Sequence, residues 1–417
     1  MRIPRRAVTR PAAAWSALAA LLLSACSAGG GTRSQEALPK NWDELRAAAR
    51  GQTVNLFMYG GDDGANSYID EEVAPAAKRR GISVKRVPVA DTQDAVQKVL
   101  GDKRAGRNSG GAVDLVWVNG ENFRTGKQAG LWLCGYTGLM PNQKYVDDED
   151  PTITQDFGTP VDDCETPWSR AQFAFVHDAA EVPEPPRTMR QLTDWIAENP
   201  GRFTYPAPPD FTGSAFVRQV LQASARGNSR VPARYSRKAY DRAAPALWKE
   251  LKKLSPKLWR KGATYPKDES ALNDLFADGE VDMAMTYGPA QVPRLVAKGK
   301  FPASTRVFVP EEGTLGNTSY LAVPENAAHR EAALVLSDLM LSPRLQYAKA
   351  RPNGWGAYSV LDRERLPGVW RKKFAAIKTP ETVLPFDELS RNAVPELSGE
   401  WVAPLDAGWK RHVLGGR

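Results

Sequence analysis

Four turns in this chain combine aromatic, glycine and polar residues, and each directly follows an apolar, strand-like segment. They are Tyr59-Gly60-Gly61-Asp62, Asn119-Gly120-Glu121-Asn122-Phe123, Asp210-Phe211-Thr212-Gly213-Ser214 and Tyr287-Gly288. In open α/β sheets, ligands bind beyond the carboxyl ends of the strands, where helix N-termini present free N–H groups. Carboxylates beside ring faces suit an organic cation, through ion pairing and cation–π attraction. The four turns therefore predict a binding cleft.

Each turn also has a simpler interpretation. Its polar residues could only cap helices, as Asp62, Asp210 and Thr212 would. Its rings could only fill a core, and the rings concerned are Tyr59, Phe123, Phe211, Tyr287 and, on a later strand, Tyr320. Taken together, the turns favour a cleft to which Tyr320 and Trp168 also contribute. A receptor for an inorganic anion would gather arginines, and Arg124 is the one arginine beside these motifs.

Catalysis has little support in the sequence. The Gly-x-Ser-x-Gly, Gly-x-x-x-x-Gly-Lys-Ser/Thr and His-Glu-x-x-His motifs are absent, and the three histidines are scattered. We therefore expect no catalytic residue, no metal and no cofactor. A carboxylate pair such as Asp210 and Glu121 could in principle perform acid–base work, as in glycosidases. An extracytoplasmic carboxylate-dependent hydrolase and a structural lipoprotein of the cell envelope thus stay as alternatives.

The N-terminal segment predicts export. Four arginines within the first ten residues precede an apolar run from Ala12 to Leu23, which ends in Leu23-Ser24-Ala25-Cys26. This pattern is typical of a signal peptide, and the run is too short for a membrane span, which needs about 20 residues. The last four residues resemble a bacterial lipobox, whose cysteine is acylated. We expect a signal peptide over residues 1–26 and a lipid on Cys26 as the only membrane contact, at the outer face of the cytoplasmic membrane or in the periplasm.

Composition and cysteine usage agree with export. The formal charge is +8, and the four arginines of the signal account for half of it, so a nucleic-acid partner is not expected. Cys134 and Cys164 form an even pair in an oxidising compartment, which predicts a disulfide. It would close a loop of about 30 residues, worth about 3–4 kcal/mol in the chain-entropy model. Two buried free thiols are the alternative. We expect a monomer.

The order of elements predicts an α/β fold with two lobes. Apolar strand-like segments at 54–58, 83–87 and 113–118 alternate with helical segments at 66–80, 91–105 and 122–129, which favours a parallel sheet covered by helices. We expect each lobe to hold such a mainly parallel sheet, with the cleft between the lobes. A flexible tether should span 27–40, the first lobe 41–167 plus 306–350, and the second lobe 168–305 plus 351–417.

Several longer motifs resemble the type II solute-binding proteins of ABC importers. Leu334–Pro343 followed by Gln346 resembles their C-terminal helix, and Leu275–Met285 resembles their helix-Gly-strand unit. Other segments are similar to the YnjB-type solute-binding lipoproteins, namely Trp117–Thr125, Tyr205–Gly213, Gly316-Asn317 and Gly354-Trp355-Gly356. The resemblance extends from about Asn41 to Trp409.

The resemblance implies a fold of the type II periplasmic binding proteins, in which two lobes close over a solute. It further implies delivery of that solute to a membrane permease that an ATPase powers. Thiamine-like compounds are often proposed as ligands of these proteins. We therefore expect a thiamine-like or other small cationic or aromatic solute.

Overall fold

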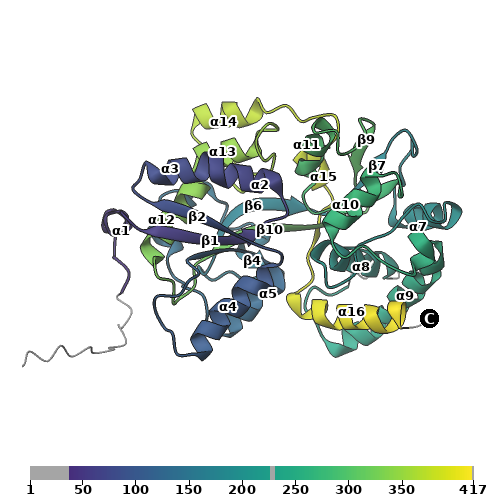
Figure 1. The fold of residues 1–417 in the computed structure, drawn as a ribbon, viewed down its shortest axis with the longest axis horizontal. Helices are drawn as coiled ribbons and strands as arrows, with labels where there is room; N and C mark the ends of the chain where they lie inside the picture. The colour runs from purple at the N-terminus through teal and green to yellow at the C-terminus, as the bar shows by residue number, and fades with distance from the viewer. Residues whose placement is uncertain (1–36, 226–230, 416–417) are drawn as a thin grey trace, which may run out of the picture. The chain divides into compact units, whose positions relative to one another are not determined.

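The computed structural model describes residues 37–225 and 231–415. The predicted signal peptide, Cys26 and most of the predicted tether lie outside the described residues. Within these residues, every helix is too short or too polar to cross a membrane. Figure 1 shows the described part, with helices packed around its strands.

A sheet of mixed direction organises the first part of the chain. β1 pairs in parallel with β2 and β3, and β10 runs antiparallel to both β3 and β6. The short β11 joins the start of β10 in parallel. The bounds are β1 Thr53–Tyr59, β2 Ser83–Val89, β3 Leu115–Val118, β6 Thr166–Gln172, β10 Leu315–Ala322 and β11 Val394–Pro395. The predicted βαβαβ order thus gives the expected parallel strands β1, β2 and β3.

Helices cover this sheet on two faces, and each face has its own apolar cluster. α12 is buried along nearly its whole length, which explains why the segment from Leu334 to Leu341 is almost continuously apolar. α4 instead buries one stripe, at Ala95, Val96 and Val99. The helices of this part are α1 Trp42–Ala48, α2 Asp63–Ser67, η1 Tyr68–Val73, α3 Ala74–Lys78, α4 Thr92–Arg104, α5 Gly120–Gln128, α6 Pro151–Thr154, α12 Arg330–Leu341, α13 Pro343–Ala350 and α14 Gly368–Ala375.

A second sheet of three strands lies in the order β8-β7-β9, and both pairings are antiparallel. The prediction of a mainly parallel second sheet is therefore wrong. The chain enters this part along β7 and leaves along the neighbouring β9, so the two strands must run in opposite directions. The elements are β7 Ala174–Asp178, β8 Met283–Thr286, β9 Thr305–Phe308, α7 Met189–Glu198, α8 Phe211–Ser224, α9 Arg237–Leu254, α10 Glu269–Ala277, η6 Pro289–Gln291, α11 Val292–Ala297, α15 Phe386–Leu389, η7 Gly399–Trp401 and α16 Val402–Trp409.

The apolar clusters indicate how the chain divides. One cluster gathers residues from Phe173 to Leu315 and from Val383 to Val413, around the second sheet. The clusters of the first sheet gather residues from Leu45 to Trp168 and from Leu321 to Phe374. The lobe boundaries stay a prediction, but these clusters favour placing residues 355–374 with the first lobe rather than with the second. Below, first and second lobe mean the parts built on these clusters.

Cys134 and Cys164 are joined by a disulfide, 30 residues apart in the sequence. Cys164 is buried in the cluster beneath α4 and α5, shortly before β6. The bond therefore ties the irregular segment between α5 and β6 back to the first lobe.

We expect the double variant Cys134→Ala/Cys164→Ala to lose about 2–5 kcal/mol of unfolding free energy, because the unfolded chain is no longer constrained by the closed loop. Urea unfolding of the wild type with and without a reductant measures the effect. The reduced wild type should match the double variant, and the variant itself should not respond to the reductant. Equal stability of oxidised and reduced wild type would contradict this role of the disulfide.

Candidate functional site

The N-terminus of α8 is one of the four predicted turns, and it is tightly fixed. Asp210 caps the helix by accepting a hydrogen bond from the Gly213 amide at 2.8 Å. A side chain at Gly213 would collide with the Pro206 carbonyl oxygen, 2.1 Å from the position of a Cβ. Ser214 Oγ donates to the Asp406 carboxylate at 2.7 Å. The glycine is thus needed because the preceding segment packs directly against the helix.

Glu269, the first residue of α10, joins this turn to the end of β8. Its carboxylate accepts hydrogen bonds from Thr212 Oγ1 at 2.5 Å, Thr286 Oγ1 at 2.7 Å and Gln291 Nε2 at 2.8 Å. Burial raises the pKa of Glu269, and the three donors oppose that shift. The sequence interpretation missed Glu269. The Asp268 N-cap directly before it was the available signal for a helix start at this point.

Asp210, Asp268 and Glu269 together form what we call the acidic cluster. Burial is the largest cause that raises the pKa of Asp210 to about 7, and the charges of Glu269 and Asp268 add to it. Tyr59, at the end of β1 in the first lobe, is close enough to the same carboxylates for their charges to act on it. Its pKa is raised first by burial and then by the charges of Glu269, Asp210 and Asp268. The acidic cluster of the second lobe therefore lies near a ring of the first.

Aromatic rings adjoin the acidic cluster. Phe211 is 39% exposed and is one of few large apolar side chains exposed among the described residues. Its ring lies 5.0 Å from the ring of Tyr287 and 6.3 Å from that of Phe157, measured between centroids. Phe157 belongs to the short hairpin of β4 Gln155–Asp156 and β5 Thr159–Pro160, in the first lobe, and was not predicted as a site residue. An exposed ring beside carboxylates can contact a cation through its face.

Tyr287 is part of a buried polar network. Its hydroxyl donates to Glu396, which also forms two hydrogen bonds of 2.9 Å with the Arg218 guanidinium. Both charged side chains are only 2% exposed. Burial is the first cause of the raised pKa of Tyr287. The Tyr287 hydroxyl is therefore occupied, and this network holds the segment before α16 against α8.

The predicted turn at 119–123 begins α5 but does not present a free helix end. The Gly120 amide, in the left-handed region at φ +63°, donates to the Asp156 carboxylate at 2.6 Å. Burial raises the pKa of Asp156 to about 8. Glu121 lies against the C-terminal segment, since a Cβ on Gly399 would come within 3.0 Å of its Cα. Asn122 is partly exposed beside it.

Three predicted ligand contacts are core residues in the structure, because Phe123, Trp168 and Tyr320 are at most 1% exposed. The Trp168 ring packs between Trp117 and Trp355, with centroid distances of 5.1 and 5.2 Å. The Tyr320 hydroxyl donates to the Ile153 carbonyl at 2.9 Å. Their burial favours the simpler interpretation raised from the sequence, in which these three rings fill the core of the first lobe.

Both carboxylate oxygens of Asp62, at the turn after β1, already have partners within the protein. One oxygen caps α2 through the Gly64 amide at 2.8 Å and pairs with Arg294 at 2.8 Å. The other accepts from Trp355 Nε1 at 2.7 Å. Arg294 lies on α11 of the second lobe, so Asp62 makes a contact between the lobes rather than offering a free carboxylate. A side chain at Gly60 would collide with Pro88, and one at Gly61 would collide with the Tyr59 ring, so glycine is needed at both positions.

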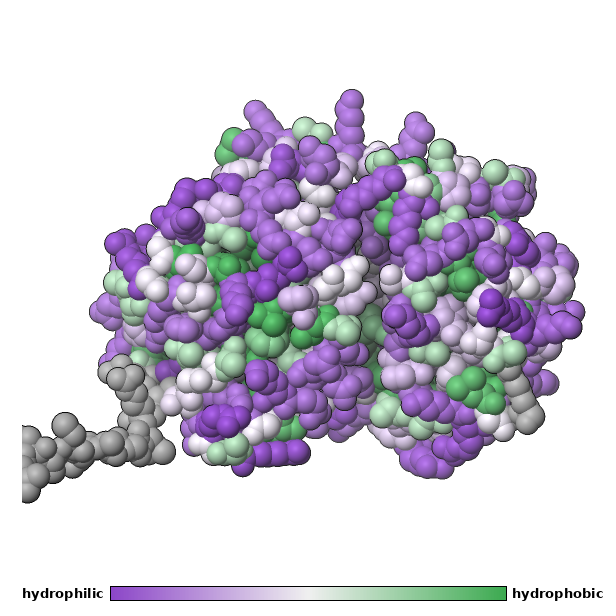
Figure 2. Space-filling model, viewed as in Figure 1, coloured by the Kyte–Doolittle hydropathy of each residue, from purple (hydrophilic) through white to green (hydrophobic). Residues whose placement is uncertain are grey.

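The structure thus brings Tyr59, Asp210, Phe211 and Glu269 together, in or beside the predicted turns. Figure 2 shows a hollow in the surface at the boundary between the two lobes. Among residues 37–225 and 231–415, no group of three or more His, Cys, Asp or Glu side chains is arranged to hold a metal ion. The arrangement combines carboxylates with ring faces, and this combination is suited to binding a cation.

Comparisons with known proteins agree with the fold. The sequence profile of the bacterial extracellular solute-binding proteins matches residues 71–373. Protein YnjB of Escherichia coli (strain K12) is 36% identical over 369 residues, which cover 88% of this chain and 93% of YnjB. The thiamine-binding periplasmic protein of Salmonella typhimurium is 25% identical over 220 residues, 53% of this chain and 57% of that protein.

A solved structure shows the same architecture at low sequence identity. The spermidine/putrescine ABC transporter substrate-binding protein PotD of Streptococcus pneumoniae matches with a TM-score of 0.57 and 14% identity, over 87% of this chain and 98% of that one. It shares the α/β fold of the type II periplasmic binding proteins. With its profile match and its similarity to YnjB over most of its length, this chain belongs to the bacterial extracellular solute-binding proteins of ABC importers.

Proposed function

We propose that this solute-binding protein captures a small organic cation of the thiamine class at the acidic cluster and delivers it to an ABC permease. The observation that carries the proposal is the position of Asp210. This carboxylate is partly exposed beside the Phe211 ring, and its pKa is raised to about 7 by burial and by two neighbouring carboxylates. A bound cation would relieve that repulsion, and this gain would contribute to binding.

The roles of the residues follow from their contacts. Asp210 would pair with the positive charge, while Phe211 and Tyr59 would lie against the flat part of the ligand. Glu269 uses its oxygens on Thr212, Thr286 and Gln291, so it acts by positioning the turn rather than by touching the solute. The name of the Salmonella relative supports this class, because the thiazolium ring of thiamine carries a permanent positive charge.

Contacts between the lobes suggest how capture closes the cleft. Arg294 of α11 pairs with Asp62 at 2.8 Å, and Lys298, directly after this helix, pairs with Asp63 at 3.3 Å. Both pairs join α11 of the second lobe to the start of α2 in the first. A solute that contacts Tyr59 on one lobe and Asp210 on the other would favour the same closed arrangement.

The carboxylates do not support the hydrolase alternative. The charges that act on Glu121 come mainly from Asp406 and Arg218, whereas those acting on Asp210 come from Glu269 and Asp268. The two candidates thus have different surroundings, and a glycosidase needs both carboxyl groups flanking one bond. We propose a receptor without catalytic activity, held at the membrane by a lipid on Cys26.

Thiamine affinity should fall about tenfold when the pH is lowered from 8 to 6. Asp210 must be ionised to pair with the cation, and its raised pKa, about 7, places its protonation inside this interval. Isothermal titration calorimetry at the two pH values measures the effect. Asp210→Asn, which can still cap α8, should bind at least tenfold more weakly at pH 8 and lose the pH dependence.

Asp274→Asn serves as the matched control, because this exposed carboxylate lies on α10 and pairs with Lys300 away from the cluster. Its thiamine affinity should equal that of the wild type. Micromolar binding of an inorganic anion, without a response to thiamine or polyamines, would refute the proposed cation site.

Arg294→Gln should weaken thiamine binding about five- to thirtyfold, because it removes a charged hydrogen bond between the lobes that is worth about 1–2 kcal/mol. Small-angle X-ray scattering should also detect a larger radius of gyration in the variant. Arg190→Gln is the control, since Arg190 pairs only within α7 and is exposed. The idea fails if Arg294→Gln and Arg190→Gln behave alike in both measurements.

Cys26→Ser should abolish acylation, because the thiol is the group that carries the lipid. Metabolic labelling with a fatty-acid analogue, followed by fractionation, should find label on the wild type and none on the variant, which is then released or keeps its signal peptide. Labelling of the variant at the wild-type level would rule out Cys26 as the anchor.

A further inference from the structure

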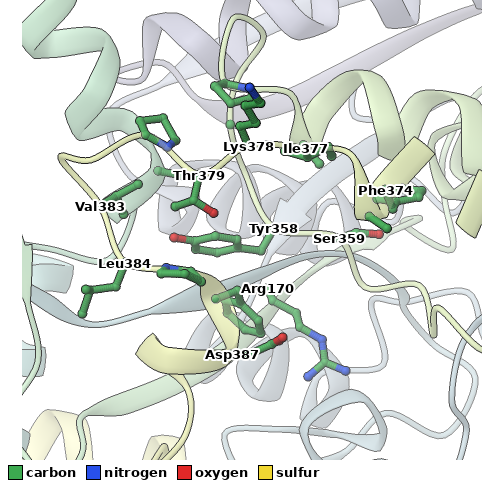
Figure 3. Close-up of a pocket in the computed structure, with 18 of the residues that line it drawn as sticks. Arg170, Tyr358, Ser359, Phe374, Ile377, Lys378, Thr379, Val383, Leu384 and Asp387 are labelled. Carbon is green, nitrogen blue, oxygen red and sulfur yellow. The ribbon is translucent and has the colours of Figure 1, made fainter. Parts of the chain in front are cut away.

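A cavity of about 560 Å³ lies apart from the acidic cluster, beside β6 and the segment that follows α14 (Figure 3). Its volume is within the range of small-molecule sites. Leu361 and Phe374 line it from the first lobe, and Ala290 of η6 and Pro293 of α11 line it from the second. An occupant would therefore touch segments of both lobes.

Part of the lining is apolar and aromatic, beside polar and charged side chains. The first lobe lines the cavity with Leu361, Leu366 and Phe374. Leu384, just before α15, and Phe386, the first residue of α15, also line it. Figure 3 shows the ring of Tyr358 between Leu384 and Phe374 in this view. That ring packs on Phe386 with 4.5 Å between centroids. The apolar part of a flat or flexible ligand would be buried against this surface.

The Tyr358 hydroxyl adds a donor inside the cavity. It is buried, and it has no hydrogen-bond partner among the described residues. Burial raises the pKa of Tyr358, so the phenol keeps its proton. A buried hydroxyl without a partner costs free energy, which a ligand oxygen placed beside it would recover.

The rim of the cavity is positive. Lys378 and Arg363 are exposed and have no ion-pair partner in the described part of the chain, whereas Arg170 is already paired with Asp150 at 2.7 Å. Asp387 is the one acidic residue among those that line the cavity. The unpaired cations thus outnumber the carboxylate at the mouth of an apolar site.

We propose that this cavity binds an amphipathic anion, with its apolar body on Leu361, Phe374 and Phe386 and its carboxylate between Lys378 and the Tyr358 hydroxyl. A medium-chain or aryl carboxylate has this chemistry. The site is separate from the acidic cluster, which has the opposite charge, so it does not depend on the proposed function.

Calorimetric titration with decanoate tests the site, and decyltrimethylammonium provides the same chain with the opposite charge. We expect one decanoate to bind per chain with a Kd below 100 micromolar, and the cation to bind at least tenfold more weakly. Lys378→Glu should weaken decanoate binding at least tenfold. Tyr358→Phe, which keeps the ring, should weaken it about fivefold through loss of one hydrogen bond.

Lys372→Glu is the matched control, because Lys372 is an exposed lysine of α14 that does not line the cavity. It should bind decanoate like the wild type, and so should Asp210→Asn, whose defect lies in the cleft. The proposal is overturned if the Kd of decanoate exceeds 100 micromolar, if both lysine variants lose affinity equally, or if Asp210→Asn abolishes decanoate binding. Failure of thiamine to bind would leave these results unaffected.

Discussion

Glu269 accepts hydrogen bonds from three side chains that come from three different segments: the start of α8, the end of β8 and the helical turn η6. This one carboxylate therefore fixes the relative positions of two predicted ligand turns. A buried carboxylate is costly unless donors surround it, and here Thr212, Thr286 and Gln291 compensate the loss of water. The arrangement also forces Asp210 to lie near another negative charge. The repulsion between Asp210 and Glu269 thus follows from the same contact that positions the two turns.

A second buried group plays a similar part for the C-terminal segment. Arg218 and Glu396 are 178 residues apart in the sequence, and their paired hydrogen bonds hold the segment before α16 against α8. Such a pair adds little net stability because both charges lose their hydration. The pair instead favours one conformation of the chain, because Glu396 also accepts a hydrogen bond from Tyr287 and so sets the orientation of that ring. These buried polar groups therefore have a structural role, while Phe211 remains exposed and Asp210 partly exposed.

Local patterns predicted the parallel strands β1, β2 and β3 of the first sheet, because alternating apolar segments and helices specify a parallel βαβ arrangement by themselves. Asp62 and Asp210 do cap helices, as the simpler interpretation from the sequence allowed. The antiparallel direction of the strands in the second sheet could not be predicted in this way. It depends on where the chain enters and leaves that lobe, and no local periodicity records this.

The missed residues have partners that are distant in the sequence. Glu269 lies 57 residues from Thr212, and Arg294 lies 232 residues from Asp62, so neither pairing leaves a local signature. Phe123, Trp168 and Tyr320 show a related ambiguity, since a ring near the end of a strand can pack inward or face a ligand with the same spacing. Burial alone separates these cases, and burial is a property of the folded chain.

The central claim is that the cleft recognises a small organic cation, and the most direct measurement identifies what the protein carries. The full-length protein should be purified from its native envelope without added ligand and mildly denatured, and the released small molecules should be identified by mass spectrometry. The account predicts an organic cation, such as a thiamine-class compound, in near-stoichiometric amount. Release of an anionic or uncharged solute in that amount would contradict it.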